Sequence, residues 1–284
     1  MWENRSKTMF ITGLALSGVL LVQMTLYAMH MLLGWEIRHN LIQFCTRTAV
    51  AIGWSSLVYA LNLLVLYTIL SLILRTGRQL LLSGRAYRRL KAAEEVRLSR
   101  MLNRRFSGGR DHIMVVEQQR PLAFTMNLLK PKIILSTGLI DLLEPEELEV
   151  VVYHEQYHRK HGDPLKTFLM SLGASVLWYI PLLPWLYHKY TIVREVLADH
   201  EAMNRLGSSA ELGSALLKLL KQGEASSARR PYASVSFADT SINYRIRLIL
   251  NPEEELPLGL PLTPTMISIQ TTLLLGSLFF FVLP

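Results

Sequence analysis

The sequence contains a single cysteine, Cys45, and little charge. Charged side chains make up 18% of its 284 residues, hydrophobic ones make up 50%, and the mean hydropathy is +0.26. One cysteine excludes an intramolecular disulfide framework and a cysteine-rich zinc site. Scarce charge combined with clumped apolar residues is typical of a protein that crosses a membrane several times.

Four apolar segments account for this composition, at residues 10–35, 49–74, 165–187 and 265–283. The first is free of charge and too long for the apolar core of a signal peptide. It also lacks a convincing cleavage site, so we expect a retained span. The second segment has the length of a span as well. Its one strongly polar side chain, Asn62, is expected to bond a neighbouring helix.

The net charge of +8 gathers in residues 75–110, directly after the second apolar segment. This stretch holds 11 arginines and lysines against two glutamates. Basic residues beside a span face the cytoplasm and its anionic lipid, so we expect contact with the bilayer and no direct binding of nucleic acid. Residues 85–105 predict a basic helix on the membrane surface. The N-terminus is then also cytoplasmic, and residues 36–48 lie outside.

The next stretch has the pattern of a small α+β domain. Residues 112–117, 121–125 and 132–136 predict three short strands. Residues 146–161 predict a helix, because a proline near its start and acids in its first turn suit a helix N-terminus. A strand edge beside that helix would suit an extended substrate, bound by strand addition.

The predicted helix carries an H-E-x-x-H motif at residues 154–158. Residues four apart lie on the same face of a helix, so His154 and His158 can bind one metal ion. Glu155 would then be the general base that takes a proton from the attacking water. Five-residue patterns also arise by chance, so the interpretation needs a third ligand.

Glu195 is the natural third ligand. It lies 37 residues after His158 and opens an E-x-x-A-D pattern on a predicted helix at 188–206. Two histidines, one glutamate and a water form a known catalytic zinc site. Asp199 follows one turn after Glu195 on the same face, where it can bond a ligand histidine and fix its orientation.

Three other polar residues lie near the predicted metal ligands in the sequence, and for two of them a second role is possible. His161 could compete as a ligand, but we expect it to be a polar residue at the helix end. Asp163, which precedes a proline, is expected to cap or end the helix, with a role beside the metal ligands as the alternative. His200 is expected to point away from the metal and to be exposed.

The metal ligands also constrain the topology. Each must lie within about 2 Å of one ion, so His154, His158 and Glu195 share one side of the membrane. The apolar segment 165–187 between them is interrupted by two prolines and must return to the side that it left. We therefore expect a re-entrant helical hairpin rather than a full crossing.

The runs ILSTGLIDLLEPEELEVVVYHEQYHRKHGDPL and WYIPLLPWLYHKYTIVREVLADHEAM resemble the zinc domain of BlaR/MecR-type membrane metallopeptidases, which are bacterial gluzincins. The resemblance covers about residues 113–250 and the flanking spans. It implies that His154, His158 and Glu195 bind zinc and that Glu155 is catalytic. It also implies self-cleavage and cleavage of a cytoplasmic protein, of which a winged-helix repressor of the BlaI type is one example.

Sensor members of that family carry an extracellular penicillin-binding domain after the last span. This sequence stops at Pro284, where its last apolar segment ends. We therefore expect no β-lactam binding, and an input signal would arrive through the spans, through the connection at 36–48 or from another protein.

The sequence thus predicts an α-helical multi-span membrane protein with a cytoplasmic α+β zincin-like metalloprotease domain and Zn²⁺ as its cofactor. The expected parts are two transmembrane helices (1–74), a basic juxtamembrane segment (75–110), the protease domain with its membrane hairpin (111–250), a linker (251–264) and a last transmembrane helix (265–284).

Two other functions compete with proteolysis. A membrane signalling or scaffold protein could hold zinc structurally, although no clear fourth protein ligand is present. A transporter would need functional polar residues within the spans, and few are present. The substrate, the stimulus and the oligomeric state stay open.

Overall fold

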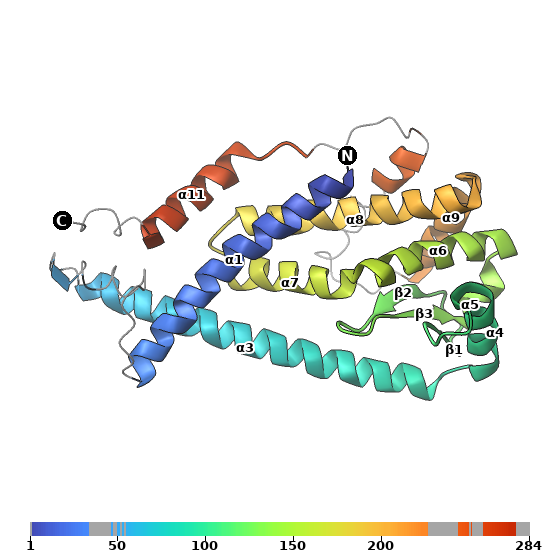
Figure 1. The fold of residues 1–284 in the computed structure, drawn as a ribbon, viewed down its shortest axis with the longest axis horizontal. Coiled ribbons are helices and arrows are strands. Elements are labelled where there is room, and N and C mark those ends of the chain that lie inside the picture. The colour runs from blue at the N-terminus through green and yellow to red at the C-terminus, as the bar shows by residue number, and fades with distance from the viewer. Residues whose placement is uncertain are drawn as a thin grey trace. The chain divides into compact units, whose positions relative to one another are not determined.

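The computed structural model describes residues 2–33, 47, 50, 51, 53, 55–226, 244–249, 251 and 258–276 (Figure 1). The chain divides into two compact units. The first, here the sheet unit, comprises Met1–Ser6, Leu82–Phe168 and Tyr190–Pro257. The second, here the helical unit, comprises Lys7–Leu81, Leu169–Lys189 and Leu258–Pro284.

A three-stranded sheet forms the centre of the sheet unit. Its strands are β1 (Ile113–Val116), β2 (Ala123–Met126) and β3 (Lys132–Ser136), in the order β1-β3-β2. β1 pairs in parallel with β3, and β2 pairs in antiparallel with β3. All three expected strands are therefore present, and β2 is an edge strand.

Both faces of the sheet are covered by helices, and strand alternation decides which side chain faces which layer. Ile113 and Val115 belong to the main core with α5 (Thr137–Leu142), α6 (Pro145–His161) and α9 (Ala210–Ser226). Met114 and Val116 face the other way and contact the last turns of α3 (Ser55–Ala92). The small sheet is thus a layer between α6 and the end of α3.

The basic stretch forms two helices where the sequence predicted one at 85–105. α3 ends at Ala92, and α4 (Val96–Ser107) begins after a short break. Across the break the chain pairs with the edge of β1, because the Glu95 amide donates to Val115 O at 2.8 Å and the Glu117 amide to Ala93 O at 2.7 Å. These sheet-like bonds stabilise the break between the two helices.

Residues next to the two ends of α6 determine where this helix begins and ends, as expected. Pro145 stands in its first turn, and the Glu144 amide donates to Glu147 Oε2 at 2.9 Å. The buried Glu147 carboxylate also accepts from Ser214 Oγ and Lys218 Nζ of α9, which joins the two helices. Gly162 ends α6 in a left-handed conformation with φ of 64°, which glycine adopts without a steric penalty.

The helical unit contains most of α1 (Trp2–Leu33), most of α3, and α11 (Leu262–Gly276). Within the described residues, the stretches Trp2–Met29 and Tyr59–Ala92 are long and apolar enough to cross a membrane. The expectation that Asn62 bonds a neighbouring helix is confirmed, because Tyr27 Oη of α1 donates to its Oδ1 at 2.6 Å.

The third apolar segment forms a turn between two helices. α7 (Asp163–Val176) ends and α8 (Leu182–Leu206) begins around a turn in which Leu177 and Ile180 are buried and the Ile180 amide bonds Leu177 O at 3.0 Å. The Leu182 amide, at the start of α8, donates to Ser268 Oγ of α11 at 2.9 Å. The chain therefore enters the helical unit on α7 and returns to the sheet unit on α8.

The remaining sequence expectations are met in part. Residues 244–249 form a short helix, and α11 starts three residues before the expected last span at 265. The connection expected at 36–48, except for Arg47, lies outside the described residues, as do residues 252–257 of the expected linker at 251–264.

Gly138 is needed where α5 starts against the loop after β1. Its amide donates to Gln118 O at 2.9 Å, and a Cβ atom at this position would lie 1.9 Å from Gln119 O. We expect Gly138→Ala to lower the free energy of unfolding by about 2 to 3 kcal/mol, because backbone has to move. Thermal unfolding in detergent measures the loss. Gly84→Ala, on an exposed helix with nothing near the new Cβ, should be neutral or slightly stabilising.

Candidate metal centre

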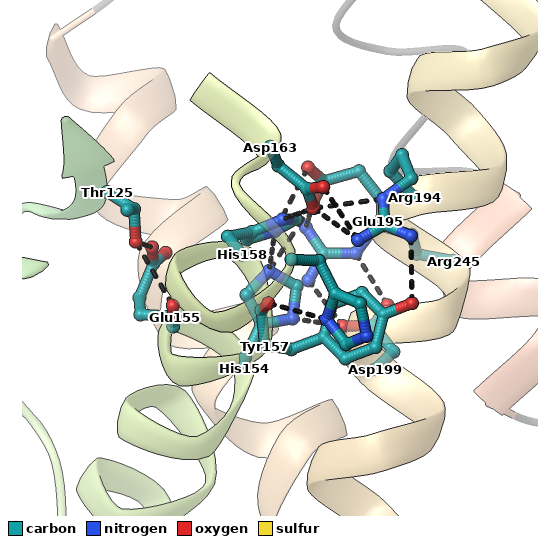
Figure 2. A network of polar contacts seen from close by, with 11 residues as sticks. Thr125, His154, Glu155, Tyr157, His158, Asp163, Arg194, Glu195, Asp199 and Arg245 are labelled. Carbon is teal, nitrogen blue, oxygen red and sulfur yellow. Dashed lines mark hydrogen bonds and ion pairs between the residues drawn. The ribbon is translucent and has the colours of Figure 1, made fainter. Parts of the chain in front are cut away.

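α6 and α8 bring three ligand-type side chains together (Figure 2). His154 and His158 lie one turn apart on α6, with their Nε2 atoms 3.1 Å apart. Glu195 of α8 places Oε2 at 3.5 Å from the first Nε2 and Oε1 at 3.5 Å from the second. One ligand atom from each of the three lies within 4.8 Å of the others, close enough to hold one metal ion.

Each of the two histidines has a carboxylate at Nδ1, the ring nitrogen that does not face the other two ligand-type residues. Asp199 Oδ1 lies 2.8 Å from His154 Nδ1, close enough for an ion pair. Asp163 Oδ2 lies 2.8 Å from His158 Nδ1. A carboxylate at Nδ1 favours a proton on that nitrogen, which leaves the Nε2 lone pair directed at the site.

Gly162 explains how Asp163 reaches His158. The left-handed glycine ends α6 only four residues after the second histidine, and α7 begins at once with Asp163. The chain reversal returns this carboxylate to the last turn of α6. The sequence interpretation gave Asp163 mainly a capping role, with a position beside the ligands as the alternative. The structure places it beside a histidine.

Arg194 is a buried cation that sequence reasoning missed. It precedes Glu195 on α8, and its Nε and NH2 atoms donate to Asp163 Oδ2 at 2.9 and 2.7 Å. Its NH1 group donates to Tyr157 Oη at 3.0 Å. Both side chains of the Arg194–Asp163 pair are 6% exposed. A buried pair of this kind leaves a costly unpaired charge if one partner is removed.

Arg245 contacts the carboxylates of Asp199 and Glu195, as Arg194 contacts that of Asp163. Its Nε and NH2 atoms reach the two oxygens of Asp199 at 2.7 Å each, a forked geometry that suits a guanidinium. Its NH1 atom lies 3.2 Å from Glu195 Oε2. This arginine comes from the short helix at 244–249, so a distant part of the chain completes the site.

The protonation properties of these groups reflect strong mutual attraction. Burial lowers the pKa of His154, but Asp199 and Glu195 outweigh this effect and raise it to about 10. Burial raises the pKa of both carboxylates, but for Glu195 the contacts with His154 and Arg245 lower it overall. For Asp199 the Arg245 charge and the His154 contact do the same. The site therefore attracts positive charge, in the form of a proton or a metal ion.

The donor set fits a divalent metal. Two imidazole nitrogens and a carboxylate match the ligand set of catalytic zinc sites. Two lone pairs at 3.1 Å, with a carboxylate beside them, repel one another unless a cation lies between them. In formal charge, the three carboxylates that contact the histidines exceed the two guanidinium groups by one, so the group has a net negative charge that favours a cation.

Glu155 lies beside the three ligand-type residues but faces β2. Figure 2 shows its side chain directed at Thr125, while His154 and His158 project toward α8. The Thr125 hydroxyl is 2.7 Å from Glu155 Oε2, and the Glu155 side chain is buried. The expected general base is therefore next to the three ligand-type residues and in contact with the edge strand.

Two other histidines lie apart from the group. His161 bonds Tyr157 O through Nδ1 at 2.9 Å, and its ring packs on the Tyr157 ring at 4.0 Å. This is the polar helix-end role that the sequence predicted. His200 was expected to be exposed, whereas it is half-buried on α8.

A protein-family model identifies the chain at this point. The model of the BlaR1 peptidase M56 family matches residues 22–250, which include the H-E-x-x-H motif, Glu195 and Asp199. The chain belongs to this family. The M56 proteins are metallopeptidases, so membership implies a bound metal and supports a proteolytic activity.

Two curated proteins are similar to parts of this M56 chain. The regulatory protein BlaR1 of Bacillus licheniformis is 27% identical over 154 residues, which cover 52% of this chain and 26% of that protein. The protease HtpX homolog 2 of Methanosarcina mazei is 29% identical over 141 residues, which cover 38% of this chain and 48% of that protein. The matched region thus spans about a quarter and about half of these two relatives. Together with the apolar helices, they support a membrane location.

The carboxylate on His154 gives a test of the site. We expect Asp199→Asn to weaken zinc binding about 10- to 100-fold, because a neutral amide does not raise the basicity of the ring as the carboxylate does. Competition between the purified protein and a zinc chelator measures the affinity, and circular dichroism checks the fold. Asp141→Asn, on the exposed surface of α5, is the matched control. Equal affinities for the two variants would contradict the arrangement.

Proposed function

We propose that this M56 chain is an integral-membrane zinc endopeptidase that acts in regulated proteolysis or signal transduction. The observation that carries the proposal is the group of His154, His158 and Glu195, with a buried glutamate next in sequence to the first histidine. His-His-Glu leaves a fourth position open for water, as catalytic zinc sites do. A structural zinc site would fill that position with another protein ligand.

Each residue of the site has a role in this reaction. Zinc held by the two histidines and Glu195 would supply Lewis acidity to polarise a peptide carbonyl and to acidify water. Glu155 accepts a proton from the attacking water and then gives it to the departing amine. Asp199 and Asp163 hold the histidine rings through Nδ1, and the two arginines hydrogen-bond those carboxylates.

We propose that the substrate binds as an extended segment along β2. Two features support this: β2 is an edge strand, and its Thr125 touches the expected general base. Strand addition aligns a peptide through its backbone, so it places few demands on side chains. A scissile bond next to Thr125 would then lie close to Glu155.

The proposed substrates are cytoplasmic regulatory proteins. A winged-helix repressor of the BlaI type is one such candidate, and the chain itself is another through self-cleavage. The regulatory relative BlaR1 supports a signalling role, whereas the HtpX homolog supports a general protease.

Loss of Glu155 tests proteolysis directly. We expect Glu155→Ala to lower cleavage of β-casein and self-cleavage at least about 100-fold, because general-base catalysis is lost. Purified zinc-loaded protein in detergent, followed by gel electrophoresis, measures both. Zinc content should stay unchanged, whereas His154→Ala should lose zinc. If Glu155→Ala leaves cleavage intact and only His154→Ala destabilises the fold, a structural zinc protein replaces the protease.

We also propose that the zinc-site domain faces the cytoplasm and that α7 and α8 form a membrane-embedded hairpin. The 11 basic residues of 75–110 support this orientation, since such residues remain on the cytoplasmic side. The ligands on α6 and α8 meet at 3.5 Å, which supports the return of the apolar segment between them.

Reporter fusions test this topology. A fluorescent reporter fused after Gly223 is expected to read cytoplasmic, because α8 returns the chain to its starting side. A reporter inserted in the connection at 36–48 is the control and should read extracytoplasmic. If both fusions read extracytoplasmic, the segment 165–187 crosses the membrane fully and the hairpin is wrong.

A further inference from the structure

Neighbouring side chains of β2 point to opposite faces of the sheet and therefore contact different partners. Phe124 and Met126 pack with the cluster of Met114, Val116 and Ile134 on one face of the sheet. Ala123 packs with the main core on the α6 face. Thr125 has the same parity as Ala123, so its hydroxyl is directed toward α6. β2 thus presents one hydroxyl to α6, and it does so at the level of Glu155.

The Thr125 hydroxyl has two acceptors in Glu155. Oγ1 lies 2.7 Å from the carboxylate Oε2 and 3.1 Å from the backbone O of the same residue. A hydroxyl has one hydrogen to donate. The shorter contact goes to the carboxylate, and a hydrogen bond to an ionised acceptor is stronger than one to a neutral carbonyl. Thr125 therefore binds mainly the side chain.

We propose that Thr125 is a positioning residue that holds the Glu155 carboxylate in the rotamer that faces β2, the edge along which the proposed substrate pairs. The inference rests on the proposed proteolytic function. In the described part of the chain, no other side chain hydrogen-bonds the Glu155 carboxylate. Thr125 occupies Oε2, which leaves Oε1 to accept the proton of the attacking water. A glutamate without this partner has several rotamers to populate, and only a fraction of them point at the reacting groups.

The same residue also links the substrate strand to the base. β2 is the edge along which an extended substrate would pair, and Thr125 is central in its register, opposite Ile133 of β3. A displacement of β2 would move the donor that orients Glu155. Catalysis therefore requires that β2 keep its position in the sheet. This requirement favours cleavage of substrates that pair with β2 over cleavage of substrates that only reach the metal.

Three variants test the proposal by kinetics on zinc-loaded protein with β-casein as the probe. Thr125→Val keeps the shape but removes the hydroxyl, and we expect kcat to fall about 10- to 100-fold with KM little changed. Thr125→Ser keeps the donor and should retain most of the activity. Thr137→Val is the control, because that hydroxyl only bonds the Gln118 backbone, at 3.1 and 3.2 Å. The proposal would be overturned if Thr125→Val and Thr137→Val lowered kcat equally, or if Thr125→Ser lowered kcat as much as Thr125→Val does.

A second measurement needs no activity. In zinc-free protein, Thr125→Val should lower the midpoint of thermal unfolding by about 3 °C when Glu155 is present. It should lower the midpoint far less in the Glu155→Ala background, because the partner is already gone. Equal shifts in both backgrounds mean that the hydroxyl does not act through Glu155 and refute the positioning role.

The two measurements also separate this inference from the proposed function. If wild-type protein cleaves nothing under any condition, proteolysis fails as the function. The zinc-free cycle still decides whether the Thr125 hydroxyl holds Glu155. If wild type cleaves and the cycle shows no coupling, proteolysis stands and the positioning role falls.

Discussion

The structure depends on one electrostatic constraint, which is the close approach of two imidazole nitrogens to a carboxylate. His154 and His158 face each other at 3.1 Å, and Glu195 lies 3.5 Å from both. Such a group of electron-pair donors is stable only around positive charge. Asp163 and Asp199 polarise the rings from behind, and Arg194 and Arg245 neutralise these two acids without entering the space between the rings.

Helical geometry makes most of this site predictable from the sequence. The four-residue spacing of His154 and His158, and of Glu195 and Asp199, puts each pair on one face of a helix. The requirement that the two faces meet predicts the return of the chain between them. Chemical logic also predicts a carboxylate behind a histidine, and Asp199 lies at His154.

The residues that escaped prediction are those whose role depends on tertiary contacts. Arg245 lies 46 residues after Asp199 in the sequence, and no spacing rule joins the two, so its role stayed open and its forked contact could not be inferred. Thr125 was expected at the end of a strand, but its meeting with Glu155 depends on the crossing of β2 and α6. The break between α3 and α4 escaped for the same reason, since it is stabilised by bonds to β1.

The contact between Ser268 and the start of α8 gives α11 a defined register. α8 begins in apolar surroundings, where an amide without a partner costs several kcal/mol. The Ser268 hydroxyl meets the Leu182 amide at 2.9 Å, and Ser268 is itself 2% exposed. By composition, α11 resembles an apolar helix that tolerates any rotation about its axis. The hydroxyl instead fixes both its rotation and its position along that axis, because a shift of one residue along the helix would turn Ser268 away and leave the Leu182 amide without this acceptor.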